Sequence, residues 1–406
     1  MNQRDDNNRK GIEYIMFSTA NFKTKTVCIP RRNCSVKEFW GVALDVGYSA
    51  VKGFSNNMVY CFPSYARKLS SPLLNIGEDN PKDIQYRGED GTIWSVGESA
   101  QNMISSSETK DSNQSLYGRN RYYSDMFKVI ARVGLAMGML ENQYDSPVGK
   151  TLTVQTGLPP AYLKSDTAMI QDVLSGTHNF SIKIGNKPWI NFNFTLPVEN
   201  ISVMAQPMGT LFSIATDNYG HAVPDAAKYF RSNMLIMDPG FGTLDVFSIK
   251  NRLIESTETF DDLGMKRVLT ETANEIFNKY HQEIKVPAMQ KNLDTGVVMC
   301  FDRKARTTKP VQFGDILERA SIKVCKEALN KIDSIYDNLF DHDYLVITGG
   351  TGAAWSEYIQ EYYKGMTSLQ VIAGSKNDNL SCVFSNVRGY YMYLISKLNK
   401  IQKQQS

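Results

Sequence analysis

Histidine is scarce in this chain, and the cysteines follow no pattern. The 406 residues include four histidines, too few and too scattered for a histidine-built metal site or a histidine-dependent catalytic triad. No two of the six cysteines form a C-x-x-C pair. Cys28 and Cys34 are close enough in the sequence to bridge, but free buried thiols are the expected state. This cysteine usage indicates a reduced, cytoplasmic compartment.

Long apolar runs and a large charge of either sign are also missing. No stretch approaches the roughly 20 apolar residues that span a bilayer, and the first forty residues lack the apolar run of a signal peptide. The 45 basic and 42 acidic residues leave a net charge of +3, whereas duplex binding needs a concentrated basic face. We therefore expect a soluble protein with no membrane and no nucleic acid as a direct partner.

The chain is long enough for two domains. A single hydrophobic core rarely serves 406 residues. The content of 42% hydrophobic and 11% aromatic residues is sufficient to bury two cores.

Two segments far apart in the sequence repeat one pattern. Residues 45–52 read Asp-Val-Gly-Tyr-Ser-Ala-Val-Lys, and residues 238–245 read Asp-Pro-Gly-Phe-Gly-Thr-Leu-Asp, each after an apolar run. Each segment is typical of a buried strand that ends in a carboxylate, then a tight turn, then a second strand. Such a turn offers backbone N–H donors to an anion, and the carboxylate beside it can hold a cation. Two copies predict a polyphosphate bound between paired hairpins, together with hydrated Mg²⁺.

The remaining elements repeat the same plan. After each hairpin the sequence predicts strands and helices in alternation. The expected strands are 151–159, 201–204, 344–348 and 371–373, and the expected helices are 122–140, 207–216, 266–280, 314–339 and 385–398. This duplication predicts an α/β fold of two duplicated domains whose mixed sheets flank a nucleotide cleft.

Five motifs in this order resemble those of the actin-like ATPase superfamily. The two repeated segments look like its two phosphate loops, and residues 347–352 (Ile-Thr-Gly-Gly-Thr-Gly) resemble its adenosine motif. Residues 203–206 (Val-Met-Ala-Gln) and residues 386–391 (Asn-Val-Arg-Gly-Tyr-Tyr) are similar to its two connecting segments. The Asp-Val-Gly-Tyr turn, the Thr-Gly-Leu-Pro end of the strand at 151–159 and the chain length are closest to the ParM-like plasmid-segregation proteins.

The resemblance covers about residues 41–400 and implies the domain boundaries. The first forty residues precede the fold; the alternatives for them are a flexible tail with one extra hairpin, or a contact arm for self-assembly. We expect four parts: an N-terminal extension (1–40), domain I (41–205, with a smaller subdomain at about 58–105), domain II (206–378, with a smaller subdomain at about 262–312) and a C-terminal return to domain I (379–406).

Asp45 and Asp238 are the first candidates for catalysis and for the metal site. Two carboxylates at the floor of a cleft repel each other unless a cation lies between them, and Mg²⁺ keeps several of its waters. We therefore expect both carboxylates to hold Mg²⁺ through water. The alternative is that each carboxylate only caps its own β-turn.

The two turns are the candidates for phosphate binding. Their backbone N–H groups can face the phosphates, whereas the bulky side chain of Tyr48 must point away from them. Lys52 can supply a cation to a triphosphate, unless it is only a solvated strand lysine. Pro239 has no N–H, so the donors of the second turn begin at Gly240. The turn residues are Gly47, Tyr48, Ser49 and Ala50 in the first segment and Gly240, Phe241, Gly242 and Thr243 in the second.

Gln206 is the candidate for hydrolysis. Phosphoryl transfer to water needs mainly positioning and charge stabilisation, so one amide that orients the water is sufficient. Glutamine is not a strong base, and turnover should therefore be slow. The alternative is a buried amide that satisfies the ends of neighbouring strands.

A third group of residues is expected around the nucleoside. The resemblance places Lys266 and Glu271 in the region of the base and ribose; the alternative is that both are solvated helix charges. A strand-to-helix turn should bring the backbone close to the α-phosphate and ribose, and it consists of Gly349, Gly350, Thr351 and Gly352.

The resemblance implies a slow ATPase that polymerises with bound nucleotide and depolymerises after hydrolysis, with Mg²⁺ and ATP as cofactors and GTP as the alternative nucleotide. Its implied partners are further copies of the chain and a DNA-bound plasmid adaptor protein. The alternatives are a cell-shape or division scaffold and a small-molecule kinase of the same superfamily. A kinase needs a carboxylate base beside its acceptor, and Gln206 is not one.

Overall fold

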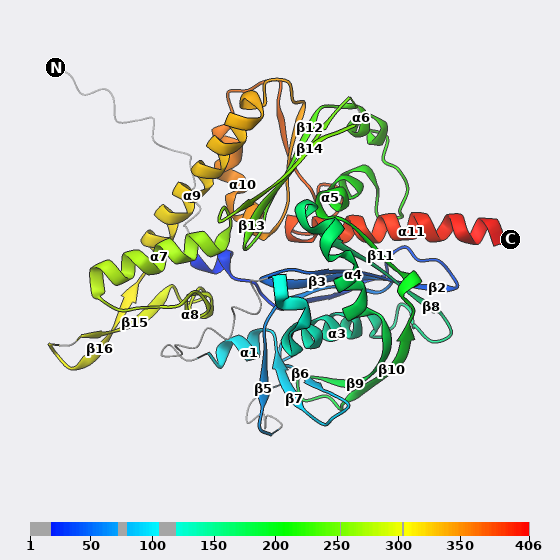
Figure 1. The fold of residues 1–406 in the computed structure, drawn as a ribbon, viewed down its shortest axis with the longest axis horizontal. Helices are drawn as coiled ribbons and strands as arrows, with labels where there is room; N and C mark the ends of the chain where they lie inside the picture. The colour runs from blue at the N-terminus through cyan, green and yellow to red at the C-terminus, as the bar shows by residue number, and fades with distance from the viewer. Residues whose placement is uncertain (1–17, 72–78, 105–118, 252, 303, 406) are drawn as a thin grey trace, which may run out of the picture.

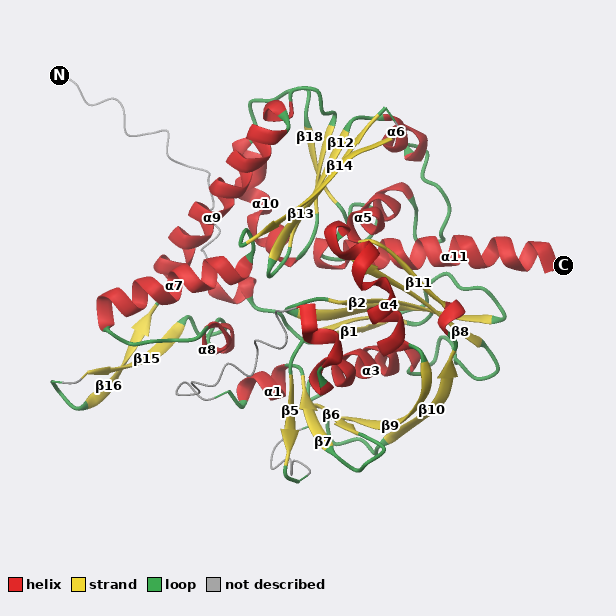
Figure 2. Cartoon of the chain, in the orientation of Figure 1, coloured by secondary structure: helices red, strands yellow, loops and turns green. Residues whose placement is uncertain are grey.

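The computed structural model describes residues 18–71, 79–104, 119–251, 253–302 and 304–405. Two domains lie one above the other in Figure 1, and each is built around a mixed sheet with helices packed against it, as the colouring by secondary structure in Figure 2 shows.

The main sheet of the first domain has six strands in the order β1-β4-β3-β2-β8-β11. Strands β4, β3 and β2 are antiparallel neighbours, whereas β8 and β11 continue the sheet parallel to β2. The strands are β1 (Val27–Pro30), β2 (Phe39–Val46), β3 (Ala50–Ser55), β4 (Met58–Pro63), β8 (Thr151–Leu158) and β11 (Ile201–Ala205).

The main sheet of the second domain repeats this arrangement as β14-β13-β12-β17-β18. Two antiparallel pairs are again followed by two parallel ones. The strands are β12 (Met234–Pro239), β13 (Thr243–Lys250), β14 (Leu253–Asp261), β17 (Tyr344–Ile347) and β18 (Gln370–Ala373). The predicted α/β fold with two duplicated domains and mixed sheets is therefore confirmed. Strand β1, which comes from the N-terminal extension, has no counterpart in this second sheet.

Both faces of the first sheet are buried, which explains the apolar run before Asp45. Helix α3 (Asp125–Met139) covers one face, where a side-chain carbon at Gly134 would lie 2.8 Å from Leu44. Helix α11 (Ser385–Gln405) covers the other face and shares a core cluster with Ala43. A strand buried on both faces is apolar at nearly every position, and the one charged residue of β2, Asp45, lies near the C-terminal end of the strand.

Helices α5 and α11 cross closely where the two domains meet. Helix α5 (Gln206–Ala215) begins directly after β11, and α11 is the long C-terminal helix in Figure 1. A side-chain carbon at Gly389 would lie 1.6 Å from the carbonyl oxygen of Gly209. Glycine at position 389 therefore lets the C-terminal return pack directly onto the first helix of domain II.

The smaller sheet of the first domain has the order β10-β9-β6-β7-β5. Its strands are β5 (Ala66–Leu69), β6 (Ile84–Arg87), β7 (Ile93–Val96), β9 (Gly176–Ile184) and β10 (Ile190–Leu196). The interval 58–105 supplies only three of them, because β4 remains paired with β3 in the main sheet. The antiparallel pair of β9 and β10 adds the other two, and its Phe180 ring lies 5.3 Å from that of Tyr86. These added strands widen a sheet that would otherwise be too small to bury its apolar face.

The second domain carries a two-stranded ribbon beside its helices. The elements are α7 (Met265–Tyr280), α8 (Val286–Lys291), β15 (Val297–Asp302), β16 (Thr307–Gln312) and α9 (Gly314–Ile335). The remaining helices are α1 (Glu98–Asn102), α4 (Leu163–Leu174), α6 (Ala226–Arg231) and α10 (Gly350–Tyr362). Three of the short 3₁₀ turns are η1 (Thr19–Phe22), η2 (Arg119–Tyr123) and η6 (Cys382–Phe384).

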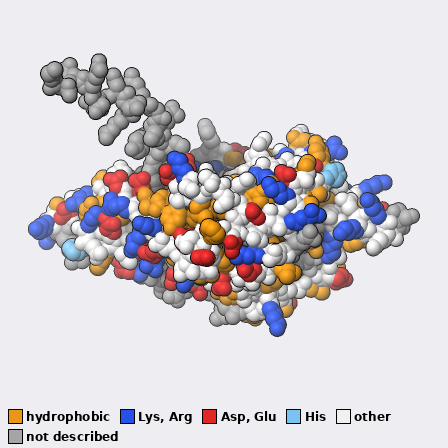
Figure 3. Space-filling model, turned by 90° about the horizontal axis from the view of Figure 1, so that it is seen from above, with side chains coloured by type: hydrophobic (Ala, Val, Ile, Leu, Met, Phe, Trp, Pro, Cys, Tyr) orange, Lys and Arg blue, Asp and Glu red, His pale blue; other side chains and the backbone are white. Residues whose placement is uncertain are grey.

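The distribution of charged side chains and the state of the cysteines are those that the composition predicts. Acidic and basic side chains are interspersed over the face shown in Figure 3, with a patch of hydrophobic side chains near its middle. All six cysteines, which lie in the described part of the chain, are free thiols. Among the described helices we find none that is both long and apolar enough to cross a bilayer.

Candidate functional site

The two repeated segments fold into equivalent turns. In the first turn the Gly47 N–H donates to the Ala50 carbonyl at 3.0 Å, and in the second the Gly240 N–H donates to the Thr243 carbonyl at 2.8 Å. Each turn begins two residues after its aspartate, and each aspartate pairs across its hairpin, Asp45 with Lys52 and Asp238 with Asp245. The repeat that the sequence predicts is therefore a repeat of backbone geometry.

Both turns line one cavity of about 850 Å³ between the domains. Of the predicted residues, fourteen line it: Asp45, Gly47, Tyr48, Ser49, Ala50, Lys52, Gln206, Asp238, Gly240, Phe241, Thr243, Gly349, Gly350 and Thr351. Gly242, Gly352, Lys266 and Glu271 are not among its lining residues.

A buried lysine lies beside the two aspartates. Lys52 Nζ is 3.2 Å from Asp45 Oδ2, and the side chains are 14% and 3% exposed. Burial alone would lower the pKa of Lys52, but the charge of Asp45, followed by that of Asp238, outweighs burial and raises it. Burial raises the pKa of Asp238, against the opposing effects of Lys52 and Asn386. Lys52 is thus a buried cation beside the two buried carboxylates Asp45 and Asp238.

Two amides hold these carboxylates in place. Gln206 Nε2 donates to Asp45 Oδ1 at 3.2 Å, and Asn386 Nδ2 donates to Asp238 Oδ2 at 2.5 Å. Asn386 in turn accepts a hydrogen bond from Thr210 Oγ1 on α5 at 2.6 Å. The connecting segment at 386–391 resembled the family motif, but its spacing alone did not show that Asn386 contacts Asp238.

The strand-to-helix turn at 349–352 meets the second phosphate-type turn. Thr351 Oγ1 donates to the Gly240 carbonyl at 2.6 Å. Gly349 has φ +78°, and a side-chain carbon there would lie 2.3 Å from Asp238 Oδ1. Position 349 therefore needs glycine for its backbone conformation and for the space beside Asp238. Gly352 packs instead against Pro239 and Ile347.

Tyr48 links the two turns from the side. Its ring lies 3.4 Å from the position that a side-chain carbon at Gly242 would occupy. The guanidinium of Arg121, from η2, stacks over the same ring, with its Cζ 4.3 Å from the ring centroid. Arg121 is buried and lines the cavity. Sequence reasoning missed it because no motif surrounds it.

Lys266 and Glu271 lie on α7, away from the cavity. Glu271 forms ion pairs with Arg267 Nε at 2.7 Å and with Lys323 Nζ at 2.8 Å. Both residues line a separate, shallow surface pocket along α7. The cavity instead extends toward Ser321, Ile322 and Tyr358 on α9 and α10, and toward residues 20–25 of the extension.

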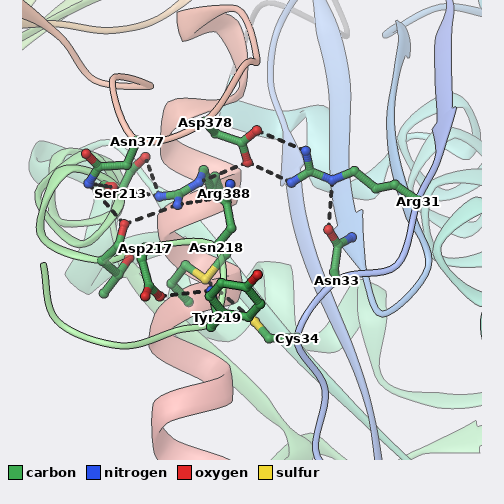
Figure 4. A network of polar contacts seen from close by, with 12 residues as sticks. Arg31, Asn33, Cys34, Ser213, Asp217, Asn218, Tyr219, Asn377, Asp378 and Arg388 are labelled. Carbon is green, nitrogen blue, oxygen red and sulfur yellow. Dashed lines mark hydrogen bonds and ion pairs between the residues drawn. The ribbon is translucent and has the colours of Figure 1, made fainter.

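A buried charge network lies where the domains join (Figure 4). Arg388 of α11 is fully buried; its Nε is 3.2 Å from Asp378 Oδ2, and its Nη1 donates to the Ser213 carbonyl at 2.6 Å. Asp378 also accepts two hydrogen bonds from Arg31, at 2.9 and 2.7 Å. The network therefore connects the extension, α5 and the C-terminal return.

The residues of the cavity fit a hydrated Mg²⁺ bound with a polyphosphate. Asp45 and Asp238 are 2% and 6% exposed and offer oxygen ligands, which Mg²⁺ prefers. Burial, and to a smaller extent the charge of Asp45, raise the pKa of Asp238 and so disfavour its ionised form. A second cation at this place would compensate the excess negative charge.

Comparisons with known proteins agree with this geometry. The family described as the N-terminal domain of actin-like proteins matches residues 43–209. A search of curated protein sequences gave no match. Among solved structures, the chain is similar to a pCBH ParM non-polymerisable quadruple mutant, with 21% identity, a TM-score of 0.66, and coverage of 88% of this chain and 99% of the other.

Two further structures show the same fold. One is a 15-stranded ParM filament from Clostridium botulinum, with 20% identity, a TM-score of 0.66, and coverage of 88% and 99%. The other is the archaeal actin homologue Ta0583 in complex with ADP, with 15% identity, a TM-score of 0.58, and coverage of 88% and 100%. Residues 43–209 therefore form an actin-like N-terminal domain, and the chain as a whole has the fold of ParM-type actin homologues, as its motifs predict.

Proposed function

We propose that this chain is a slow ATPase that assembles into filaments when nucleotide is bound and disassembles after hydrolysis, with GTP as the alternative nucleotide. The observation that carries the proposal is the pair of equivalent turns on one cavity, with Asp45, Asp238 and Lys52 at its floor. Backbone N–H groups in such turns bind phosphate oxygens, and the lysine adds a mobile positive charge.

The predicted residues that line the cavity have the following roles in this proposal. Asp45 and Asp238 hold the waters of Mg²⁺, which neutralises phosphate charge when it is bound. Gln206, at the start of α5, orients the attacking water. The backbone N–H groups of residues 47–50 and 240–243 bind the phosphates, and the turn at 349–351 lies against the α-phosphate and the ribose. Lys266 and Glu271 have no role in it, because neither lines the cavity.

Binding between two domains can also drive assembly. A ligand that touches both turns interacts better with the closed arrangement, so it shifts the population toward that arrangement. The crossing of α5 and α11 at Gly209 and Gly389 lies beside the site, so such a closure would change the packing of these two helices.

The ParM-like fold supports a proposal for the biological role. We propose that the filament separates copies of plasmid DNA in the cytoplasm through a DNA-bound adaptor protein, with further copies of this chain as its other partner. A ParM filament with this fold supports self-association. The net charge of +3, with acidic and basic side chains interspersed over the face shown in Figure 3, favours indirect over direct contact with DNA.

The direct test is light scattering of the purified chain after addition of ATP or GTP with Mg²⁺. A nucleotide-dependent rise that decays as phosphate is released is the expected result. Binding of a nucleotide should be confirmed in parallel by equilibrium titration. Confirmed binding without any rise in scattering would remove the filament proposal and leave a nucleotide-binding protein.

A further inference from the structure

The described part of the N-terminal extension crosses from one domain to the other along the cavity. Residues 18–25 contact the smaller subdomain of domain II, and β1 then pairs with β4 of domain I, where Val27 lies opposite Cys61. In Figure 1 this blue segment runs from beside α7 to the sheet of domain I. We name residues 18–25 the strap.

The strap is anchored on domain II by specific contacts. Thr19 Oγ1 donates to the Leu293 carbonyl at 2.5 Å, and its methyl group packs over Gly314. Lys23 forms an ion pair with Asp294, in which the lysine side chain is only 6% exposed. Phe22 packs against the hydrophobic core of domain II. These contacts join segments about 270 residues apart in the chain, so they are tertiary and specific.

The other end of the extension is anchored near the junction of the domains. Arg31 follows β1 directly and makes the bidentate contact with Asp378 that Figure 4 shows. Its guanidinium also lies 5.0 Å from the centroid of the Phe54 ring. The strap is therefore anchored on domain II by residues 19–23, and the residues that follow it are fixed on domain I by the pairing of β1 with β4 and by the contact of Arg31 with Phe54.

The strap also forms part of the cavity wall. Ala20, Phe22, Lys23 and Lys25 line the same cavity as Lys52 and Gly350. The phosphates of a nucleotide would occupy the two turns, so the remainder of the molecule extends toward α9, α10 and the strap. A nucleotide that extends in this direction would contact residues 20–25, which Thr19 and Lys23 hold on domain II.

We propose that the strap retains the nucleotide: it closes one wall of the cavity, and its release from Leu293 and Asp294 permits nucleotide exchange. This inference rests on the proposed nucleotide binding and adds a residue-level control of the exchange rate. It assigns residues 18–25 a role within their own molecule, whereas the contact-arm hypothesis for the first forty residues assigns one between copies. Residues 1–17 lie outside the described part of the chain.

The test measures dissociation of a fluorescent ATP analogue, methylanthraniloyl-ATP with Mg²⁺, during a chase with excess ATP. Lys23→Asp and Asp294→Lys each break the ion pair, so each should accelerate release roughly tenfold, since breaking a charge pair acts mainly on the dissociation rate. The double variant restores the pair with its charges exchanged and should release the analogue near the original rate. Lys37→Asp, an exposed position outside the strap, is the matched control.

Thr19→Val provides a second variant that keeps the size of the side chain. It removes the hydrogen bond to Leu293 while retaining the packing over Gly314, and it should also accelerate release. The strap proposal would be contradicted if the single variants released the analogue at the original rate. It would also be contradicted if release were faster in the single variants and equally fast in the double variant. If the unaltered chain does not bind the analogue at all, the proposed nucleotide binding is contradicted. If it binds the analogue but the variants release it at the original rate, only the strap proposal is contradicted.

Discussion

Gln206 donates a hydrogen bond of 3.2 Å to Asp45, and this contact joins the start of α5 to the end of β2. The amide proposed to orient water is therefore held by the carboxylate proposed to hold the waters of Mg²⁺. One hydrogen bond connects the two parts of the proposed chemistry.

Replacing Gln206 with alanine tests that connection. Gln206→Ala removes one positioned polar group, so phosphate release should be slower by about 10²–10³-fold. Assembly should persist, because the turns that bind the phosphates are unchanged. Phosphate release and light scattering measured on the same sample provide the check. Unchanged phosphate release would assign the catalytic role to another group.

Lys52→Met tests the balance of charge in the site. The substitution leaves Asp45 and Asp238 as two buried carboxylates without their cation, and removing one partner of a buried ion pair costs about 3–5 kcal/mol. Urea unfolding should show this loss, and nucleotide affinity should fall with it. Lys364→Met is the control, since its ion pair with Glu361 is exposed and should contribute little. Equal effects of the two substitutions would contradict the prediction.

Gly349→Ala tests the turn beside Asp238. The new side-chain carbon would lie 2.3 Å from Asp238 Oδ1 in a backbone conformation with φ +78°, so either the turn or the aspartate must move. We expect loss of nucleotide binding and a lower thermal midpoint. Gly365→Ala, which has open space around it, should change neither quantity. Normal binding by the Gly349 variant would show that the turn tolerates a side chain.

Asp378→Asn tests the network at the domain junction. The carboxylate lies between Arg31 and Arg388, and both guanidinium groups lose their negative partner in the variant. The free energy of unfolding should fall by about 3–5 kcal/mol. Glu361→Gln at an exposed ion pair is the matched substitution and should have no measurable effect. An Asp378 variant with an unchanged free energy of unfolding would mean that Ser213 and the other neutral acceptors are sufficient to stabilise the buried charge of Arg388.

Two buried histidines predict how stability depends on pH. Burial lowers the pKa of His178 and of His342 below the ordinary value of 6.5. The unfolded chain therefore binds protons more readily at these sites, so stability is full above pH 6.5 and is lost as the pH falls below it. Neither ring nitrogen of His342 has a hydrogen-bond partner among the described residues. His342→Phe should flatten this part of the stability curve, whereas His221→Phe, at an exposed position, should leave it unchanged.

Much of the site could be predicted because its chemistry is local. A carboxylate at a strand end, followed by glycine and hydroxyl residues, predicts a turn from neighbouring residues alone. Two copies of this pattern predict one ligand bound by both turns. The same holds for the strand-to-helix turn at 349–352. The partners of these turns could not be predicted in this way. Asn386 and Arg121 reach the site from distant parts of the chain.

Lys266 and Glu271 show the limit of arguing from sequence position. Helix α7 does begin beside the second turn, where the Lys266 N–H donates to the Phe241 carbonyl at 2.8 Å. The direction of a side chain depends on how the helix rotates against its neighbours, and here α9 attracts Glu271 through Lys323. Proximity in the sequence was sufficient to place the helix but not to orient its side chains.

The sequence by itself determined the duplicated fold, the two equivalent turns and the carboxylate at the end of each buried strand. A run of apolar residues predicts a buried strand, and the residues that follow it predict the turn, so both are local in the sequence. Only the tertiary structure decided that residues 18–25 lie along the cavity, and that Arg31 meets Asp378 where the domains join. Contacts between residues some 270 or 350 positions apart depend on the packing of whole domains, and no local pattern in the chain specifies them.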